Sequence, residues 1–207
     1  MLLKKLKLKK IKGDASLRTF FRKKNRNLSS IVVYAKKEKK INLLIYDSIN
    51  KIFIKNNILA PNLLNENYSK NFIEIQDFGD ETIFSILKKK RKNKLLIFKK
   101  ILSLLKKIQS IRDREIVNFK KQKNIVPEYY TKILLKEAEL FTNWYVFKKL
   151  SKSKYLIFRK NYKKVIKKLI KKINQKNNTF VHRDFHVSNL MICKNKVAII
   201  DSQDALI

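Results

Sequence analysis

Two histidines occur in the chain, and both lie in the stretch FVHRDFHVSNLMI, residues 180–192. The same stretch holds Asp184, Ser188 and Asn189 between apolar flanks. A carboxylate in such a loop can accept a proton from a hydroxyl, and an amide oxygen can coordinate a cation. The loop is therefore where we first expect chemistry.

Two short apolar segments, LMIC (190–193) and VAIID (197–201), follow the loop and are separated by KNK. This pattern predicts a β-hairpin, which would bring Asp201 back beside Asn189. Mg²⁺ prefers a small number of hard oxygen ligands from the protein, which leave room for water and phosphate oxygens. The arrangement matches the phosphoryl-transfer template of kinase-like enzymes, with Asp184 as the catalytic base and Asn189 and Asp201 as metal ligands.

Two other interpretations of the loop are weaker. His182 and His186 are four residues apart, as in a zinc-binding helix, but Arg183 stands where that motif has Glu, and the stretch lacks helical periodicity. The three polar residues of the loop and hairpin could also be turn residues and caps. Their order and the hairpin that joins them favour catalysis. We expect His182 to hold the loop by hydrogen bonds and His186 to contact the substrate or the metal shell.

The elements before the loop change character near residue 80. Alternating and β-branched segments predict strands near 17–23, over 29–35 and within 71–80, and apolar spacing predicts a helix over 41–56. After residue 80 the spacing predicts mainly helices, including a long one that begins near Tyr130. The chain therefore reads as a small sheet followed by a helical part.

The composition is strongly basic, with 51 Lys and Arg against 16 Asp and Glu and a net charge of +35. The basic residues are spread along the whole chain, and Gly and Pro number two each. This even spread favours a background composition bias over a nucleic-acid footprint. The expected partner is a small molecule.

One cysteine, Cys193, excludes an internal disulfide framework. No apolar run approaches the roughly 18 residues that a membrane span needs. Lysines interrupt the apolar residues of the basic start, so no signal peptide is predicted. We expect a cytoplasmic protein.

The motifs resemble those of a known family. HRDFHVSNLM followed by IIDSQDA resembles the aminoglycoside phosphotransferase superfamily, relatives of the protein kinases, and within it the bacterial N-acetylmuramate/N-acetylglucosamine anomeric kinases. GDASLRTFFR (13–22) resembles their nucleotide loop, and FIEIQDFGD (72–80) their last N-lobe strand and hinge. PEYYTKILLKEAELFTNWY (127–145) resembles a helix near their sugar site.

The resemblance implies an α+β, protein-kinase-like two-lobed fold. A small antiparallel-sheet N-lobe with one helix would span residues 1–79 and bind nucleotide. A helical C-lobe with the catalytic loop and metal hairpin would span 80–207. The family's chain runs further into C-lobe helices, so an incomplete C-lobe is expected.

The resemblance also implies binding roles outside the loop. The turn that covers the ATP phosphates would consist of Gly13, Asp14, Ala15 and Ser16, and the adenine hinge of Gln76, Asp77 and Phe78. The sugar would be contacted by His186, Glu137 and Trp144, although Trp144 is as well explained by a helix core stripe.

The sequence departs from the pattern at the third strand. Protein kinases carry a lysine there that pairs with the α- and β-phosphates, whereas Val33 or Tyr34 holds that place here. Arg22 and Lys36 are the candidates to replace it. Ser202 stands where an aromatic residue usually follows the metal-binding Asp.

The function that the resemblance implies is transfer of phosphate from ATP, with Mg²⁺, to a sugar hydroxyl. The expected acceptor is the anomeric hydroxyl of N-acetylmuramate or N-acetylglucosamine in cell-wall recycling. Choline, an amino alcohol or an aminoglycoside stays open, because Glu128, Glu137 and Glu139 could receive a cationic acceptor. An inactive remnant that binds nucleotide or RNA is the remaining alternative.

Overall fold

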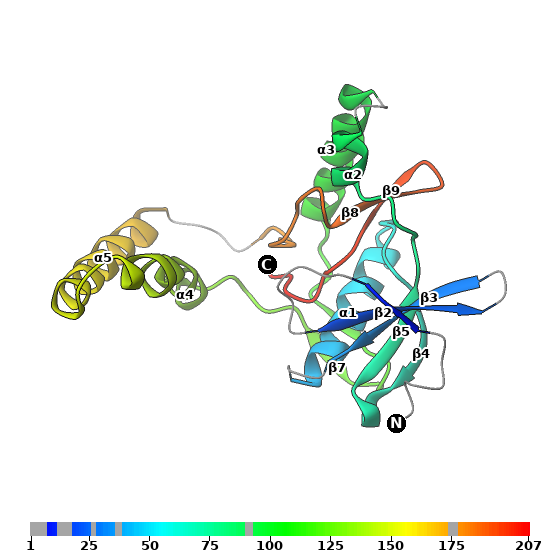
Figure 1. The fold of residues 1–207 in the computed structure, drawn as a ribbon, viewed down its shortest axis with the longest axis horizontal. Helices are drawn as coiled ribbons and strands as arrows, with labels where there is room; N and C mark the ends of the chain where they lie inside the picture. Colours follow the sequence, from blue (N-terminus) through cyan, green and yellow to red (C-terminus); the bar gives the residue numbers. More distant parts are fainter. Residues whose placement is uncertain (1–7, 12–17, 26–27, 36–38, 90–92, 174–177) are drawn as a thin grey trace. The chain divides into compact units, whose positions relative to one another are not determined.

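The computed structural model describes residues 8–11, 18–25, 28–35, 39–89, 93–173 and 178–207 (Figure 1). The predicted phosphate turn at 13–16, and Lys36, lie outside the described residues. The chain divides into two compact units, residues 1–126 with 179–206 and residues 127–178 with 207. This division into compact units does not test the predicted boundary between an N-lobe and a C-lobe after residue 79, which stays a prediction.

The first unit contains a five-stranded antiparallel sheet. Its strands, in spatial order, are β1 (Leu8–Lys10), β2 (Thr19–Asn25), β3 (Leu28–Tyr34), β5 (Phe72–Gln76) and β4 (Leu63–Asn67). The β-branched residues of β3 and β5 suit a half-buried pleated surface. The strands predicted near 17–23, over 29–35 and within 71–80 are thereby confirmed, whereas β4 was not predicted.

Helix α1 (Ile41–Lys55) packs against one face of this sheet. Leu43 and Tyr46 of the helix join Val33 and Ile73 of the sheet in one buried cluster. The helix ends where Asn57 takes a positive φ of 56° and the Ile58 N–H bonds to the Phe53 carbonyl at 2.9 Å, a left-handed C-terminal cap. The predicted helix over 41–56 is confirmed.

Elsewhere in the first unit, the described residues form a 3-10 turn (Tyr68–Lys70), two α-helices and two hairpins. Helices α2 (Ile83–Lys88) and α3 (Lys94–Ser110) begin at Thr82 and Asn93, whose side chains cap the first turn. The hairpins are β6 (Glu115–Val117) with β7 (Lys123–Ile125), which was not predicted, and β8 (Leu190–Cys193) with β9 (Lys196–Ile199), which was.

The second unit is helical. Helix α4 (Thr131–Leu140) continues through a π turn (Phe141–Tyr145) and a 3-10 turn (Val146–Lys148), and α5 (Lys152–Ile173) follows. Glu139 of α4 pairs with Lys163 of α5 at 2.8 Å. Trp144 is 69% exposed, so it is not part of the core of this unit. Among the described residues, no helix has the length and apolar character that crossing a membrane requires.

Candidate functional site

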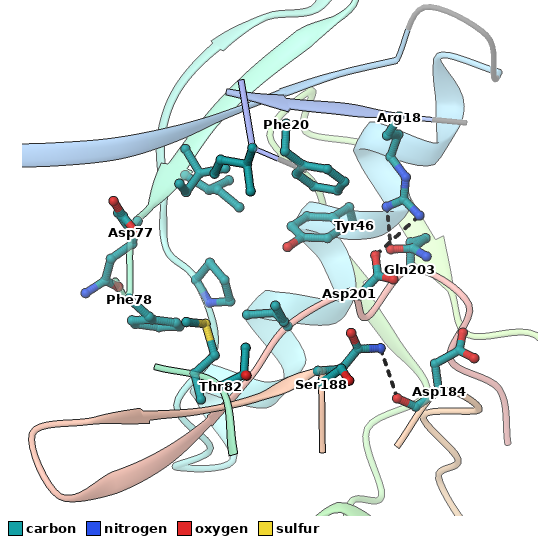
Figure 2. A pocket seen from close by; sticks show the side chains of 18 of the residues that line it. Arg18, Phe20, Tyr46, Asp77, Phe78, Thr82, Asp184, Ser188, Asp201 and Gln203 are labelled. Atoms are coloured by element: carbon teal, nitrogen blue, oxygen red, sulfur yellow. Dashed lines mark hydrogen bonds and ion pairs between the residues drawn. The ribbon is translucent and has the colours of Figure 1, made fainter. Parts of the chain in front are cut away.

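A cavity of about 980 Å³ is lined entirely by residues of the first unit (Figure 2). This volume lies at the upper end of the range for small-molecule sites. Its lining includes apolar residues, namely Ile31, Pro61, Ile75, Phe78, Met191 and Ile200, and polar residues, namely Arg18, Asp184, His186, Ser188, Asn189, Asp201, Gln203 and Asp204. Figure 2 shows Asp77 and Phe78 at one end of the cavity, called the hinge end, and Arg18, Asp184, Asp201 and Gln203 at the other, called the polar end.

The loop that precedes β8 is held by its own backbone. The Asp184 carbonyl accepts hydrogen bonds from the His186 N–H at 3.0 Å and from Asn189 Nδ2 at 3.1 Å. The Asn189 N–H donates to the His186 carbonyl at 2.9 Å. These bonds fix the Asn189 side chain next to Asp184, and both residues line the cavity.

The β8–β9 hairpin brings the second carboxylate to the same place. Its turn residues, Lys194 and Asn195, both have positive φ, as a tight hairpin turn of this twist requires. Leu190 pairs with Ile199, and the Ile200 N–H bonds to the Asn189 carbonyl at 3.0 Å. The predicted hairpin is confirmed, and Asp201 lies beside Asn189 on the cavity wall.

Asp201 sits in a strained and partly buried position. Its φ is +65°, in the left-handed region. Its Oδ1 atom is buried and accepts no hydrogen bond among the described residues, although Arg18 Nη2 lies 3.4 Å away. Burial raises the pKa of Asp201, the charge of Arg18 opposes this, and the charge of Asp184 adds to it. Such an acceptor is suited to a cation.

Helix α1 anchors the segment after Asp201. The buried Ser202 hydroxyl donates to Asn50 Oδ1 at 2.6 Å. Tyr46, one helical turn earlier, also faces Asp201 (Figure 2). Burial, with the negative charge of Asp201, raises the pKa of Tyr46 to about 12. Ser202 stands at the position where the resembled pattern has an aromatic residue, and it makes a hydrogen bond to helix α1 instead.

His182 belongs to the core. It is 2% exposed, and its ring stacks on Phe53 with centroids 6.0 Å apart. Burial lowers the pKa of His182 to about 4, against an ordinary value of 6.5, although the charge of Asp184 opposes the shift. The structure therefore shows His182 as a packed core residue, and its expected role in holding the loop by hydrogen bonds stays a prediction.

The low pKa of His182 predicts a loss of stability in mild acid. The unfolded chain takes up a proton near pH 6.5 and the folded chain only near pH 4. Stability is therefore fully present above pH 6.5 and falls as the pH falls through this window. We expect a loss of roughly 2 kcal/mol between pH 7 and pH 5, measured by urea unfolding. His182→Gln should flatten this dependence, and an unchanged slope in the variant would contradict it.

The hinge end of the cavity carries an ion-pair cluster. Arg22 contacts both oxygens of Asp77, at 2.6 and 3.1 Å, and also Asp80 at 2.6 Å. Its guanidinium donates further to the carbonyl of Gly79, whose φ of +86° suits glycine. Burial alone would raise the pKa of Asp77, but the hydrogen bonds from Arg22 and the Gly79 N–H outweigh it and the pKa is lowered. Arg22 thus lines the cavity with its charge already paired.

The other residues predicted at the hinge also lie on the wall. Phe78 is buried and packs with Met191 and Ala198. Gln76 lines the cavity, and its Oε1 accepts a hydrogen bond from Asn62 at 3.0 Å. Gln76, Asp77 and Phe78 therefore all line the cavity, and their adenine-binding role stays a prediction.

The predicted substrate residues divide between the two units. His186 is exposed on the cavity wall, and its Nε2 lies 3.3 Å from Asn189 Nδ2. Glu137 and Trp144 belong to the second unit. Glu137 accepts a hydrogen bond from the Tyr129 hydroxyl within that unit. The sugar-binding roles of these residues stay predictions.

Arg18 is a cavity residue that sequence reasoning missed. It lies just before β2, and Figure 2 shows its guanidinium facing Gln203 and Asp201. Arg18, Phe20 and Arg22 alternate along the chain and all line the cavity. The two-residue period of a strand, counted back from Arg22, was the signal that could have found it.

Comparisons with known proteins identify the family of the chain. The family model described as "Phosphotransferase enzyme family" matches residues 7–207. Two curated relatives are N-acetylmuramate/N-acetylglucosamine kinases. The protein from Neisseria meningitidis serogroup B is 26% identical over 197 residues, which cover 94% of this chain and 55% of that protein. The one from Pseudomonas aeruginosa is 23% identical over 194 residues, covering 94% and 54%. The chain thus spans about half the length of these relatives.

Solved structures show the same fold. The aminoglycoside phosphotransferase APH(2")-IIa, in a ternary complex with streptomycin and ATP, is similar with a TM-score of 0.60 and 15% identity, over 97% of this chain and 67% of that one. An ethanolamine kinase from Plasmodium vivax has a TM-score of 0.60 and 16% identity, over 98% and 57%. The predicted α+β, protein-kinase-like fold class is confirmed, and by its match over nearly its whole length the chain belongs to the phosphotransferase enzyme family.

Proposed function

We propose that this chain carries the nucleotide and catalytic site of a kinase that transfers phosphate from ATP to a hydroxyl of an N-acetylated amino sugar. The observation that carries the proposal is the cavity, which has Phe78 at its hinge end, Asp184 and Asp201 at its polar end (Figure 2), and Asn189 in its lining. A nucleotide has the matching polarity, with a flat base at one end and phosphates at the other. The names of the two curated relatives support the acceptor class.

The apolar part of the lining is suited to the adenine ring. Ile31 and Ile75 of the sheet and Met191 of the hairpin supply apolar surface on its wall. Backbone groups between Gln76 and Phe78 would bind the base edge, as in kinase hinges. The Arg22–Asp77 pair keeps this segment against β2, because a bidentate guanidinium–carboxylate contact fixes direction as well as distance.

The polar end fits a magnesium ion. Among the described residues no three His, Cys, Asp or Glu side chains are grouped to hold a metal. Asn189 and Asp201 would hold the ion as a pair, together with phosphate and water oxygens, which is how Mg²⁺ usually binds. The buried Oδ1 of Asp201 supplies an acceptor for it. The bound ion would neutralise charge on the phosphates.

Asp184 would act on the acceptor. Its backbone is fixed by two hydrogen bonds to its carbonyl, while its side chain is exposed to the cavity. A carboxylate held in this way can orient a sugar hydroxyl and accept its proton as the oxygen attacks phosphorus. The hydroxyl proton would pass to Asp184, a bond would form between the sugar oxygen and the γ-phosphorus of ATP, and the bond from that phosphorus to the bridging oxygen would break, so that ADP leaves.

Nucleotide binding is the first test of the proposal. Thermal unfolding of the 207-residue chain with ATP and Mg²⁺ should show a midpoint about 5 °C or more higher at 100 times the Kd. N-acetylmuramate and N-acetylglucosamine should then accept radiolabelled phosphate in preference to choline, ethanolamine and aminoglycosides. Preference for a cationic acceptor would move the proposal to the alternative substrate class. Salt-sensitive RNA binding with no response to ATP would refute the kinase assignment.

A further inference from the structure

The site lacks a cation on its third strand. Strand β3 (LSSIVVY) contains no basic residue, and its side chains nearest the cavity are apolar. Ile31 lines the cavity, and Val33, two residues on, is fully buried in the core. A nucleotide triphosphate nevertheless needs positive charge near its phosphates. Another element must supply that charge.

Among the described residues, the arginine and lysine side chains that line the cavity are those of Arg18 and Arg22. Arg22 lies at the hinge end, where Asp77 and Asp80 take up its guanidinium. Arg18 lies at the polar end, next to Asp201 and Gln203. Among the described residues, position therefore selects Arg18 as the residue that faces the phosphates.

Two contacts orient the guanidinium of Arg18. Nη1 donates to Gln203 Oε1 at 2.5 Å, and Nη2 lies 3.4 Å from Asp201 Oδ1. The Arg18 side chain is 8% exposed, so water competes little with a bound anion.

Gln203 ties Arg18 to the catalytic loop. Its Nε2 donates to Asp204 Oδ2 at 2.6 Å, and Arg183 Nη1 donates to the Asp204 carbonyl at 3.4 Å. The amide of Gln203 is thus held from one side while its oxygen receives Arg18 from the other. This arrangement fixes the direction in which the guanidinium points.

We propose that Arg18 is the cation that binds the phosphate groups of the nucleotide, and that Gln203 is the residue that positions it. The inference rests on the proposed function, since it specifies how the same cavity holds ATP. A guanidinium can bind two phosphate oxygens at once, which a lysine cannot. Arg18, which lies just before β2, would therefore take the place of the third-strand lysine.

The test compares nucleotides that differ only in their phosphates. Binding of ATP, ADP and adenosine is measured by calorimetry for the wild type and Arg18→Met, with and without Mg²⁺. The variant should bind ATP and ADP about 10- to 100-fold more weakly and adenosine within about twofold of the wild type. Lys24→Met, which removes one charge from an exposed position of the same strand, is the matched control and should bind all three like the wild type.

Two further variants separate a phosphate contact from a structural role. Arg18→Lys keeps the charge and should lose a few-fold in ATP affinity. Gln203→Leu should also weaken ATP selectively, because Arg18 loses its acceptor. Circular dichroism checks that each variant is folded. If Arg18→Met does not fold, the ATP affinity of Arg18→Lys decides whether Arg18 contacts phosphate.

The outcomes distinguish failure of this inference from failure of the proposed function on which it rests. A wild type that binds neither ATP nor adenosine would refute the proposed function. A wild type that binds ATP, with Arg18 variants that bind it equally well, would overturn the inference alone. Equal losses for ATP and adenosine would show that Arg18 supports the fold and does not contact phosphate, which also overturns it.

Discussion

Asp184→Asn should lower the rate of phosphate transfer by about 10²- to 10⁴-fold, the range that a positioned general base contributes. The amide cannot take the hydroxyl proton, but it has nearly the shape of the carboxylate. The hydrogen bonds that fix this loop use the backbone carbonyl of residue 184, so they survive the change. ATP affinity should therefore stay within a few-fold of the wild type.

Initial rates with the preferred sugar acceptor and calorimetry with MgATP measure the two effects. Glu115→Gln is the control, because it removes one carboxylate from an exposed position on β6 outside the cavity. Its rate should match the wild type. Turnover by Asp184→Asn at the wild-type rate would mean that another group accepts the proton.

Phe53→Ala should lower the free energy of unfolding by roughly 3–5 kcal/mol, as expected when a fully buried aromatic ring is removed. Phe53 is fully buried on α1. Its ring meets Phe180 edge-on at 5.5 Å and stacks on His182 at 6.0 Å. These two residues lead into the catalytic loop, so the cavity left by the substitution would loosen the support of Asp184 as well.

Urea unfolding measures the loss, with Phe98→Ala as the matched control. Phe98 is 48% exposed on α3, so its truncation should cost less than about 1 kcal/mol. Similar losses for both variants would show that α1 does not carry the core of the site. A drop in turnover of folded Phe53→Ala, measured at low temperature, would show the effect on the loop directly.

Strong local signals made much of this fold predictable. Helix α1 has apolar residues at helical spacing, and the β8–β9 hairpin has two apolar segments around a polar turn. Strand β4 was missed because LLNEN has neither alternation nor β-branched residues. It pairs with β5 through an irregular register, so tertiary contacts rather than local preference define it.

The site was predictable where its residues are close in sequence. Asp184, Asn189 and Asp201 belong to one loop and hairpin, whose geometry follows from a tight turn. Arg18 meets Gln203 across 185 positions of the chain, and no local pattern records such a contact. The paired charge of Arg22 likewise depends on a distant turn at 77–80.

The bond between the Ser202 hydroxyl and Asn50 has a mechanical consequence. Helix α1 holds Ser202, the residue adjacent to Asp201, so a tilt of this helix would also move the Asp201 carboxylate. Any displacement of this helix would therefore also change the position of Asp201 on the wall of the cavity.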